Sequence, residues 1–228
     1  MPLLLVVVVV CGVVLAVVWT RLRQARRAEF IRHHPLPRGL YDALRQKHPQ
    51  LQPRDCQLVA QGLRAFFGSY LASGFKPVAM PSQVADNLWH EFILHTRAYE
   101  AFCQQAFGRF LHHTPAVALS SVAVSNASLR RCWWHCCRAE NIDPASPTRL
   151  PLLFALDAKL GIAGGFRYVP DCGPLSRRSD GDGGATVVHC GTGFADGSVD
   201  GSTDGFGDGG GGSGDGGGGD GGGGCSSD

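Results

Sequence analysis

Residues 81–115 of this 228-residue chain hold four of its nine histidines, together with carboxylates spaced to act on them. Asp86 and His90 are four residues apart, and side chains at this spacing lie on one face of a helix. A carboxylate beside an imidazole orients a histidine that binds a metal ion or transfers a proton. Glu91 and His95 repeat this pair, rotated by about one residue around the helix. The segment is therefore the first candidate for chemistry.

A further donor follows the predicted helix. His112 and His113 come shortly after Gly108, a residue at which the chain can turn and bring one of the two rings back. No resident cofactor is the favoured expectation, and the alternative is a divalent metal ion such as zinc, which imidazole and carboxylate donors suit. The predicted metal site consists of His90, Asp86 and His113, with Cys103 or Glu91 nearby.

Two other interpretations fit the same residues. In the first, which is favoured over the metal site, Trp89 and His90 are packing residues and the remaining histidines are solvated or hydrogen-bonded to the backbone. In the second, the segment is a zinc-protease helix, whose H-E-x-x-H motif places two histidines four residues apart. The fourth position after His90 is Leu94, and His95 lies about 140° around the helix from His90. The sequence therefore predicts no protease-type zinc site.

The second cluster of possible metal ligands is rich in cysteine. Cys132, His135 and Cys136 share one face of another predicted helix, and a soft metal ion such as zinc binds such donors. Structural zinc sites pair two short ligand segments across a loop, and here only Cys172 offers a donor from elsewhere. Trp133 lies beside the thiols, and free cysteine behaves as a small buried apolar residue. We interpret this cluster as packing.

The surrounding pattern predicts an all-α fold. Residues that start and end helices recur from position 36 onward, and no stretch alternates apolar and polar residues as a hairpin does. We expect a compact bundle of about five helices over residues 36–178. The longest helix, which carries the site, starts after Ser82, reaches about Ala106 and is ended by Gly108. The other helices are expected at 37–47, 53–74, from about 128 past 137, and 151–160.

The first 20 residues predict a transmembrane anchor. The run from Pro2 to Trp19 carries no charge, and its 18 residues give a helix of roughly 27 Å, close to the thickness of a bilayer core. A cleaved signal peptide is the alternative, but it has positive charge before the apolar run and small residues after it. Here the basic residues follow, in a juxtamembrane segment at 21–35. This excess of basic residues after the apolar run predicts that the later residues lie in the cytoplasm. We therefore expect a single-pass protein of the inner membrane, with membrane lipid as the partner of residues 2–19.

The end of the sequence has a different composition. Residues 180–228 hold 22 of the 32 glycines and nine aspartates, and contain no lysine or arginine. We expect 179–228 to be a disordered Gly/Asp-rich tail, with a calcium-binding repeat as the less favoured alternative. The rest of the chain then carries 21 basic against ten acidic residues, but these bases are scattered and form no recognition motif. Nucleic-acid binding is not expected, and neither is a large multidomain enzyme or a polytopic transporter.

Residues 81–115 resemble the glycine-rich-domain-like proteins of bacteria, which carry the pattern P-S-x-x-V-D-x-x-W-H-x-x-I-x-x-T-x-x-Y-x-x-F-C followed by F-G-x-F, H-H and Pro. Ala85 separates Val84 from Asp86, which leaves Asp86 three residues before Trp89 as in the pattern. Residues 150–172 resemble the second block of that family. The resemblance implies a helical domain with a membrane anchor and a Gly-rich end, and implies no reaction. The matching positions of the first block are Pro81, Ser82, Val84, Trp89, His90, Ile93, Thr96, Tyr99, Phe102, Cys103, Phe107, Gly108, Phe110, His112, His113 and Pro115.

These observations leave two hypotheses for function. The first is a noncatalytic assembly or interaction module, held at the membrane and binding a protein partner. The second is a metal-binding protein or metal-dependent enzyme built on His90, Asp86 and His113. One geometric criterion separates them: the second hypothesis needs the rings of His90 and of His112 or His113 within ligand range, in a pocket that water reaches.

Overall fold

The computed structural model describes residues 2–113, 122–170, 188–191 and 194, and within these ranges the chain is mostly helical, as predicted. Two short strands pair in parallel, with Tyr168 opposite His189. Strands of three residues are too short to show an alternating pattern, so the sequence did not predict them. In chain order the elements are α1 (Pro2–His33), α2 (Leu40–Lys47), α3 (Pro53–Ala72), α4 (Gln83–Leu94), α5 (Thr96–Phe107), α6 (Val122–Ala139), α7 (Leu152–Lys159), β1 (Arg167–Val169) and β2 (Val188–Cys190).

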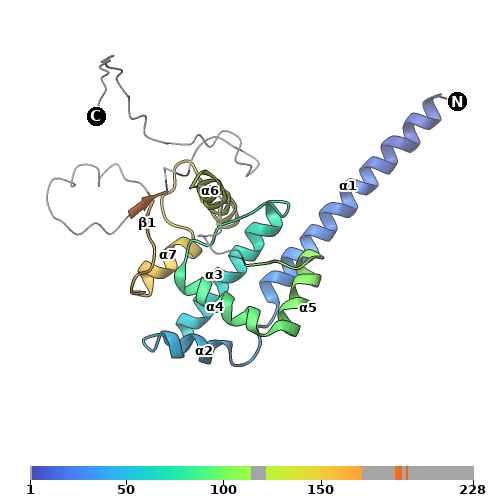
Figure 1. Ribbon diagram of the computed structural model, residues 1–228. Coiled ribbons are helices and arrows are strands. Elements are labelled where there is room, and N and C mark those ends of the chain that lie inside the picture. The colour runs from blue at the N-terminus through green and yellow to red at the C-terminus, as the bar shows by residue number, and fades with distance from the viewer. Residues whose placement is uncertain (1, 114–121, 171–187, 192–193, 195–228) are drawn as a thin grey trace, which may run out of the picture.

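Helix α1 projects away from the other helices (Figure 1). The large apolar side chains from Leu4 to Leu22 are exposed, whereas Ile31 near its C-terminal end is only 1% exposed. The helix is long and apolar enough to cross a membrane by length and composition. Its last turns pack against α3 and α5 and so join the apolar segment to the helical body.

Helix α3 forms the centre of the helical body and contacts α1, α2, α4, α6 and α7. The apolar residues at helical spacing on this helix, including Val59, Leu63 and Phe66, are buried. Gly62 faces α7, and a Cβ atom at this position would lie 2.4 Å from Cδ1 of Leu156. The absence of a side chain therefore allows these two helices to approach closely.

The prediction of one long helix from Ser82 to about Ala106 is wrong. The chain bends at His95, where ψ is 57°, and divides into α4 and α5. Helix α4 contacts α2, α3 and α7, whereas α5 contacts α1. The bend lets aromatic residues on both sides enter one core, because the rings of Phe92 and Tyr99 lie 5.2 Å apart and both side chains are buried. No glycine or proline marks the bend, so local sequence signals did not reveal it.

Gly108 ends α5 as predicted. It adopts a left-handed conformation with φ of 71°, and its N–H donates to the carbonyl oxygens of Cys103 and Gln104. The guanidinium of Arg27 lies against this glycine, 2.6 Å from the position that a Cβ atom would take. The turn directs the following residues back across α4, which is the condition that the predicted site required.

Most of the predicted tail, residues 179–228, lies outside the described residues, and so does Cys172. Strand β2 falls within this segment and pairs with β1 of the helical body. Phe194 also belongs to it, and its ring lies 5.6 Å from that of Trp133 on α6. The start of the predicted tail therefore includes residues that pack on the helical body.

Candidate metal centre

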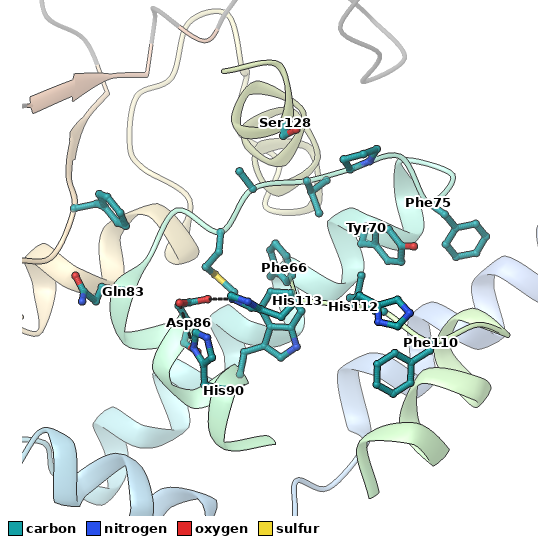
Figure 2. Close-up of a pocket in the computed structure, with 17 residues that line it drawn as sticks. Phe66, Tyr70, Phe75, Gln83, Asp86, His90, Phe110, His112, His113 and Ser128 are labelled. Atoms are coloured by element: carbon teal, nitrogen blue, oxygen red, sulfur yellow. Dashed lines mark hydrogen bonds and ion pairs between the residues drawn. The ribbon is translucent and has the colours of Figure 1, made fainter. Parts of the chain in front are cut away.

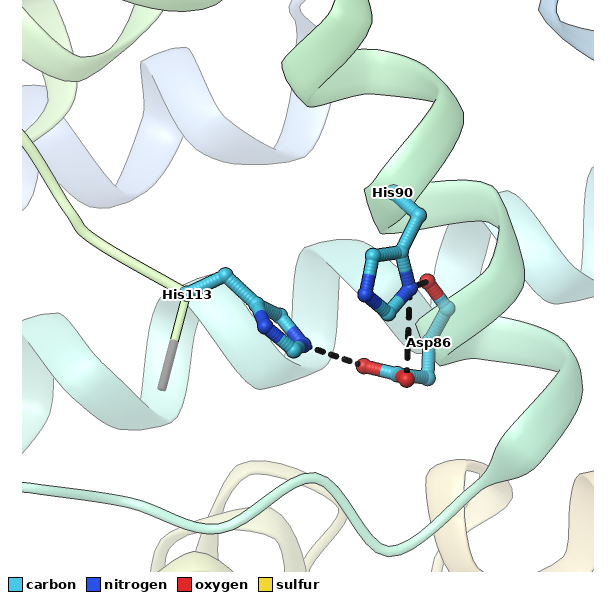
Figure 3. Close-up of side chains that lie close together, drawn as sticks. All are labelled: Asp86, His90 and His113. Atoms are coloured by element: carbon cyan, nitrogen blue, oxygen red, sulfur yellow. Dashed lines mark hydrogen bonds and ion pairs between the residues drawn. The ribbon is translucent and has the colours of Figure 1, made fainter. Parts of the chain in front are cut away.

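The structure brings Asp86, His90 and His113 together. The first two lie one turn apart on α4, and the third arrives from the segment after α5 (Figure 3). One potential ligand atom from each side chain lies within 4.8 Å of the other two. The rings of His90 and His113 are 4.2 Å apart. Whether these residues bind a metal stays a prediction, but the geometric criterion for such a site is met.

The hydrogen bonds define the proton positions in this triad of Asp86, His90 and His113. Nδ1 of His90 lies 2.9 Å from the backbone carbonyl oxygen of Asp86 and 3.3 Å from its Oδ2. A carbonyl oxygen only accepts, so Nδ1 carries the proton and Nε2 of a neutral ring keeps its lone pair. Nε2 of His113 lies 3.0 Å from Oδ1 of Asp86 and donates to it in the same way, and a cation bound between these two atoms would replace that proton. The carboxylate thus orients both rings.

The triad is accessible to solvent. The exposed fraction of the side chain is 45% for His90, 31% for Asp86 and 16% for His113. Trp89 supports His113 from the protein interior, with ring centroids 4.7 Å apart, and is itself buried. Trp89 therefore packs in the core, as the packing interpretation expects, whereas His90 faces the solvent.

A pocket of about 620 Å³ contains the triad. Figure 2 shows Asp86 and His90 on α4, with Phe75 and Phe110 farther along the pocket. Its walls are mostly apolar, and pockets of this size and character hold small organic ligands. One part of the wall is the segment 77–80, which hydrogen bonds to α6 hold in place. The other apolar or aromatic lining residues include Phe66, Tyr70, Met80, Leu111 and Phe166.

The segment that forms this wall is fixed by hydrogen bonds to α6. The N–H of Ala79 donates to the carbonyl oxygen of Ser128 at 3.2 Å. The guanidinium of Arg131 donates to the carbonyl oxygen of Pro77. These contacts join residues about 50 positions apart, so no local pattern in the sequence identifies α6 as part of the pocket.

The other donors considered in the sequence do not join the triad. Glu91 forms an ion pair with Lys47 of α2 at 2.7 Å, which fixes α2 against α4. Cys103 is fully buried, and burial raises the pKa of its thiol, so the proton is retained and the sulfur is a poor ligand. His95 lies at the bend between the helices, and the ring of His112 contacts that of Phe110 in a tilted arrangement with centroids 4.8 Å apart.

The cysteine cluster of α6 is packed, in agreement with our interpretation. Cys132, Cys136 and Cys137 are at most 2% exposed. The sulfur atoms of the first two lie 4.0 Å apart. The hydrogen bond between Cys136 and Cys132 and the burial of the thiol raise the pKa of Cys136 well above its usual range, so its thiol stays protonated. A metal ion binds the thiolate form of cysteine, and the buried surroundings of Cys136 disfavour that form.

Asp157 of α7 positions the helix that carries the site, and sequence analysis missed this role. It is only 2% exposed, and its carboxylate accepts hydrogen bonds from the backbone N–H groups of Gln83, Val84 and Phe166 at 2.8, 3.2 and 2.9 Å. The hydroxyl of Ser82 donates to it at 2.8 Å. The carboxylate therefore caps the N-terminus of α4 from a distant part of the chain, where its charge is favourable.

Tyr99 fixes the segment that delivers His113. Its buried hydroxyl accepts a hydrogen bond from the indole N–H of Trp89 at 3.1 Å and donates to the carbonyl oxygen of Leu111 at 2.6 Å. Burial raises the pKa of this hydroxyl, so it remains a donor. The hydrogen bond to residue 111 holds the backbone two positions before His113.

Replacing Tyr99 by phenylalanine is expected to lower the free energy of unfolding by about 1–3 kcal/mol. The loss follows because the variant leaves a buried indole N–H and a carbonyl oxygen without a partner. Thermal unfolding of the full chain in detergent measures the effect. Tyr41→Phe is the control, and it should cost less than about 0.5 kcal/mol because Tyr41 is only partly buried. Equal losses in the two variants would contradict the role of the Tyr99 hydroxyl.

Comparison with models of protein families gives one match, to the family described as UCP032817-like, over residues 26–194. This range covers most of the chain and includes α2 to α7. The chain belongs to the UCP032817-like family. The resemblance to glycine-rich-domain-like proteins is therefore wrong. Many positions that carried it, such as Val84, Tyr99 and Phe102, are buried core residues, and apolar spacing of this kind is common in helical domains.

The UCP032817-like match includes all three residues of the triad and also Asp157 and Tyr99. It begins within α1, after the apolar residues 2–19, and ends at Phe194. The name of the family specifies no reaction. Neither a curated protein nor a solved structure matches the chain.

Proposed function

We propose that this member of the UCP032817-like family is a membrane-anchored metal-binding protein, with a divalent cation held by Asp86, His90 and His113. The observation that carries the proposal is the convergence of one carboxylate and two imidazoles within 4.8 Å in a solvent-accessible pocket. Had His90 been enclosed by apolar side chains, the noncatalytic module would be the better hypothesis.

The donor set favours a reactive site over a structural one. Structural zinc sites are closed by four protein ligands, whereas catalytic sites use three and keep a position for water or substrate. Two histidines and one carboxylate also suit iron(II) and other first-row divalent ions. Zinc remains the first candidate, and three protein ligands would leave a position for water or substrate.

The apolar walls of the pocket suggest the general shape of a ligand. A molecule with a polar group at the triad and an apolar body toward Phe75 and Phe110 would match the arrangement of polar and aromatic side chains. The bound metal would act as a Lewis acid on that polar group. Asp86 and the two histidines would hold this metal in place.

The membrane part of the proposal rests on α1. Its apolar side chains from residue 4 to 22 are exposed, and an apolar surface of this extent needs a nonaqueous environment. The basic residues after Trp19 favour an orientation with the helical body in the cytoplasm. Resistance of the full chain to carbonate extraction from membranes tests the anchor, and release into the soluble fraction would contradict it.

Elemental analysis tests the metal site. The full chain, purified in detergent without chelator and then exposed to zinc or iron(II), is expected to retain about one equivalent of metal. His90→Ala and His113→Ala should each lose it. His95→Ala is the matched control, because it removes an exposed histidine at the end of the same helix and should keep the metal. A wild-type chain that binds neither metal, or variants that bind as much as the wild type, would overturn the proposal.

A further inference from the structure

A second, strongly basic groove lies between α1 and α5. It has a volume of about 370 Å³ and is separate from the pocket of the triad. Three arginines of α1 form one side and two glutamines of α5 the other, and all five side chains can donate hydrogen bonds. We define the basic groove by its lining residues, Arg23, Arg26, Arg27, Phe30, Gln104 and Gln105.

The positive charge of the basic groove is not balanced within the described part of the chain. No acidic side chain there lies within 4 Å of Arg23, Arg26 or Arg27. Glu29, the acidic residue of α1, is engaged by Arg32 and His33 at 3.2 and 2.9 Å. The arginines of the groove therefore repel one another, and an anion bound between them would reduce this repulsion.

Arg109 adds to this repulsion. Its guanidinium lies over the ring of Phe75 at 4.6 Å, and its charge acts on Arg27 together with that of Arg23. Arg27 is partly buried beside Gly108, so it cannot move freely into solvent to reduce the repulsion. Arginine forks pair with the oxygen atoms of phosphate in a bidentate manner, and several converge here.

The position of the basic groove along α1 favours the phosphate of a lipid headgroup as its ligand. Arg23 lies over the ring of Trp19 at 5.3 Å, where the exposed apolar part of α1 gives way to basic residues. Tryptophan and arginine at such a boundary lie at the depth of lipid headgroups. This step rests on the membrane anchor of the proposed function. Basic segments next to a membrane helix attract anionic lipids.

We infer that the basic groove binds the headgroup phosphate of an anionic phospholipid, with Arg23 and Arg27 as its principal ligands and the amides of Gln104 and Gln105 as further donors. The bound lipid would join α1 to α5 at the membrane surface. It would thereby fix the angle at which the helical body, with its metal pocket, meets the membrane.

Lipid titration of the full chain in uncharged detergent tests the inference. The melting temperature is measured by tryptophan fluorescence with added phosphatidylglycerol, phosphatidylcholine or inorganic phosphate. The double variant Arg23→Gln/Arg27→Gln is compared with the control Arg21→Gln/Arg38→Gln, which removes the same charge elsewhere. Arg21 points about 160° away from Arg23 on the helix, and Arg38 lies beyond it. The single variant Arg23→Gln is added because its exposed side chain can be replaced without loss of packing.

Phosphatidylglycerol is expected to raise the melting temperature of the wild type, whereas phosphatidylcholine and inorganic phosphate leave it unchanged. The double variant should need at least about tenfold more phosphatidylglycerol for the same shift, the single variant should need more lipid than the wild type, and the control should behave as the wild type. An equal response to both lipids, an equal loss in the control, or a shift produced by inorganic phosphate would overturn the inference. So would a wild type that does not respond, as expected if the acidic tail of the chain fills the groove.

Metal content measured on the same samples keeps the two proposals separate. The groove variants should retain the metal of the wild type, because the arginines lie outside the pocket of the triad. If the groove variants lose the lipid response and retain the metal, the result supports the groove and leaves the metal site unaffected. Absence of metal from every sample, with the lipid response intact, would remove the metal site and leave the groove.

Discussion

Asp157→Ala is expected to lower the free energy of unfolding by about 3–5 kcal/mol. The carboxylate is buried and accepts four hydrogen bonds, so its removal leaves the first N–H groups of α4 and the N–H of Phe166 without partners. Hydrogen bonds to a charged group contribute about 1.5–3 kcal/mol each, but neighbouring bonds are not additive. Thermal unfolding of the full chain should show a melting temperature lower by roughly 10 °C.

The surrounding structure offers little compensation for this change. Gly165 lies so close that a Cβ atom there would be 2.7 Å from Cβ of Asp157, and water has limited access to the N–H groups left behind. Asp143→Ala is the control, because that carboxylate is exposed and accepts one hydrogen bond, from the N–H of Ala145 at 2.9 Å. The control should cost less than about 1 kcal/mol. Similar losses in both variants would show that Asp157 does not hold α4.

Local sequence patterns predicted the parts of the site that depend on local geometry. The spacing of Asp86 and His90 placed both on one helix face, and Ser82 and Gly108 were recognised as the residues that start and end this region. Each of these features depends on backbone hydrogen bonds within a few residues, which the side chains at those positions favour. The return of His113 to the helix was predicted from the same glycine.

The features that were missed depend on contacts between distant segments. Asp157 is 75 positions from Ser82, and the sequence around it is that of an ordinary apolar helix. The bend at His95 has the same origin, because it is imposed by the packing of α4 and α5 on different helices. The basic groove also requires α1 and α5 to meet, and the arginines alone predicted only a juxtamembrane segment.

Asp86→Asn is expected to weaken metal binding by about 100-fold while leaving the fold intact. The amide has nearly the same shape as the carboxylate, but it carries no charge for a cation and its NH₂ group cannot accept from either ring. The single amide oxygen can accept from only one of the two rings that the carboxylate contacts at 3.0 and 3.3 Å, so one histidine loses its side-chain partner. Isothermal titration with zinc measures the affinity, and Asp42→Asn, an exposed aspartate in the first turn of α2, is the control.

The same variant also separates a metal ligand from a residue that only supports the fold. At a metal concentration 100 times the dissociation constant, binding should stabilise the wild type by about 2.7 kcal/mol. A 100-fold weaker site would then contribute only about 0.4 kcal/mol. Without metal, the two proteins should unfold within about 1 kcal/mol of each other, because Asp86 is partly exposed. If Asp86→Asn destabilised the metal-free protein by several kcal/mol and left the stabilisation by zinc unchanged, Asp86 would be a structural partner of the two histidines and not a ligand.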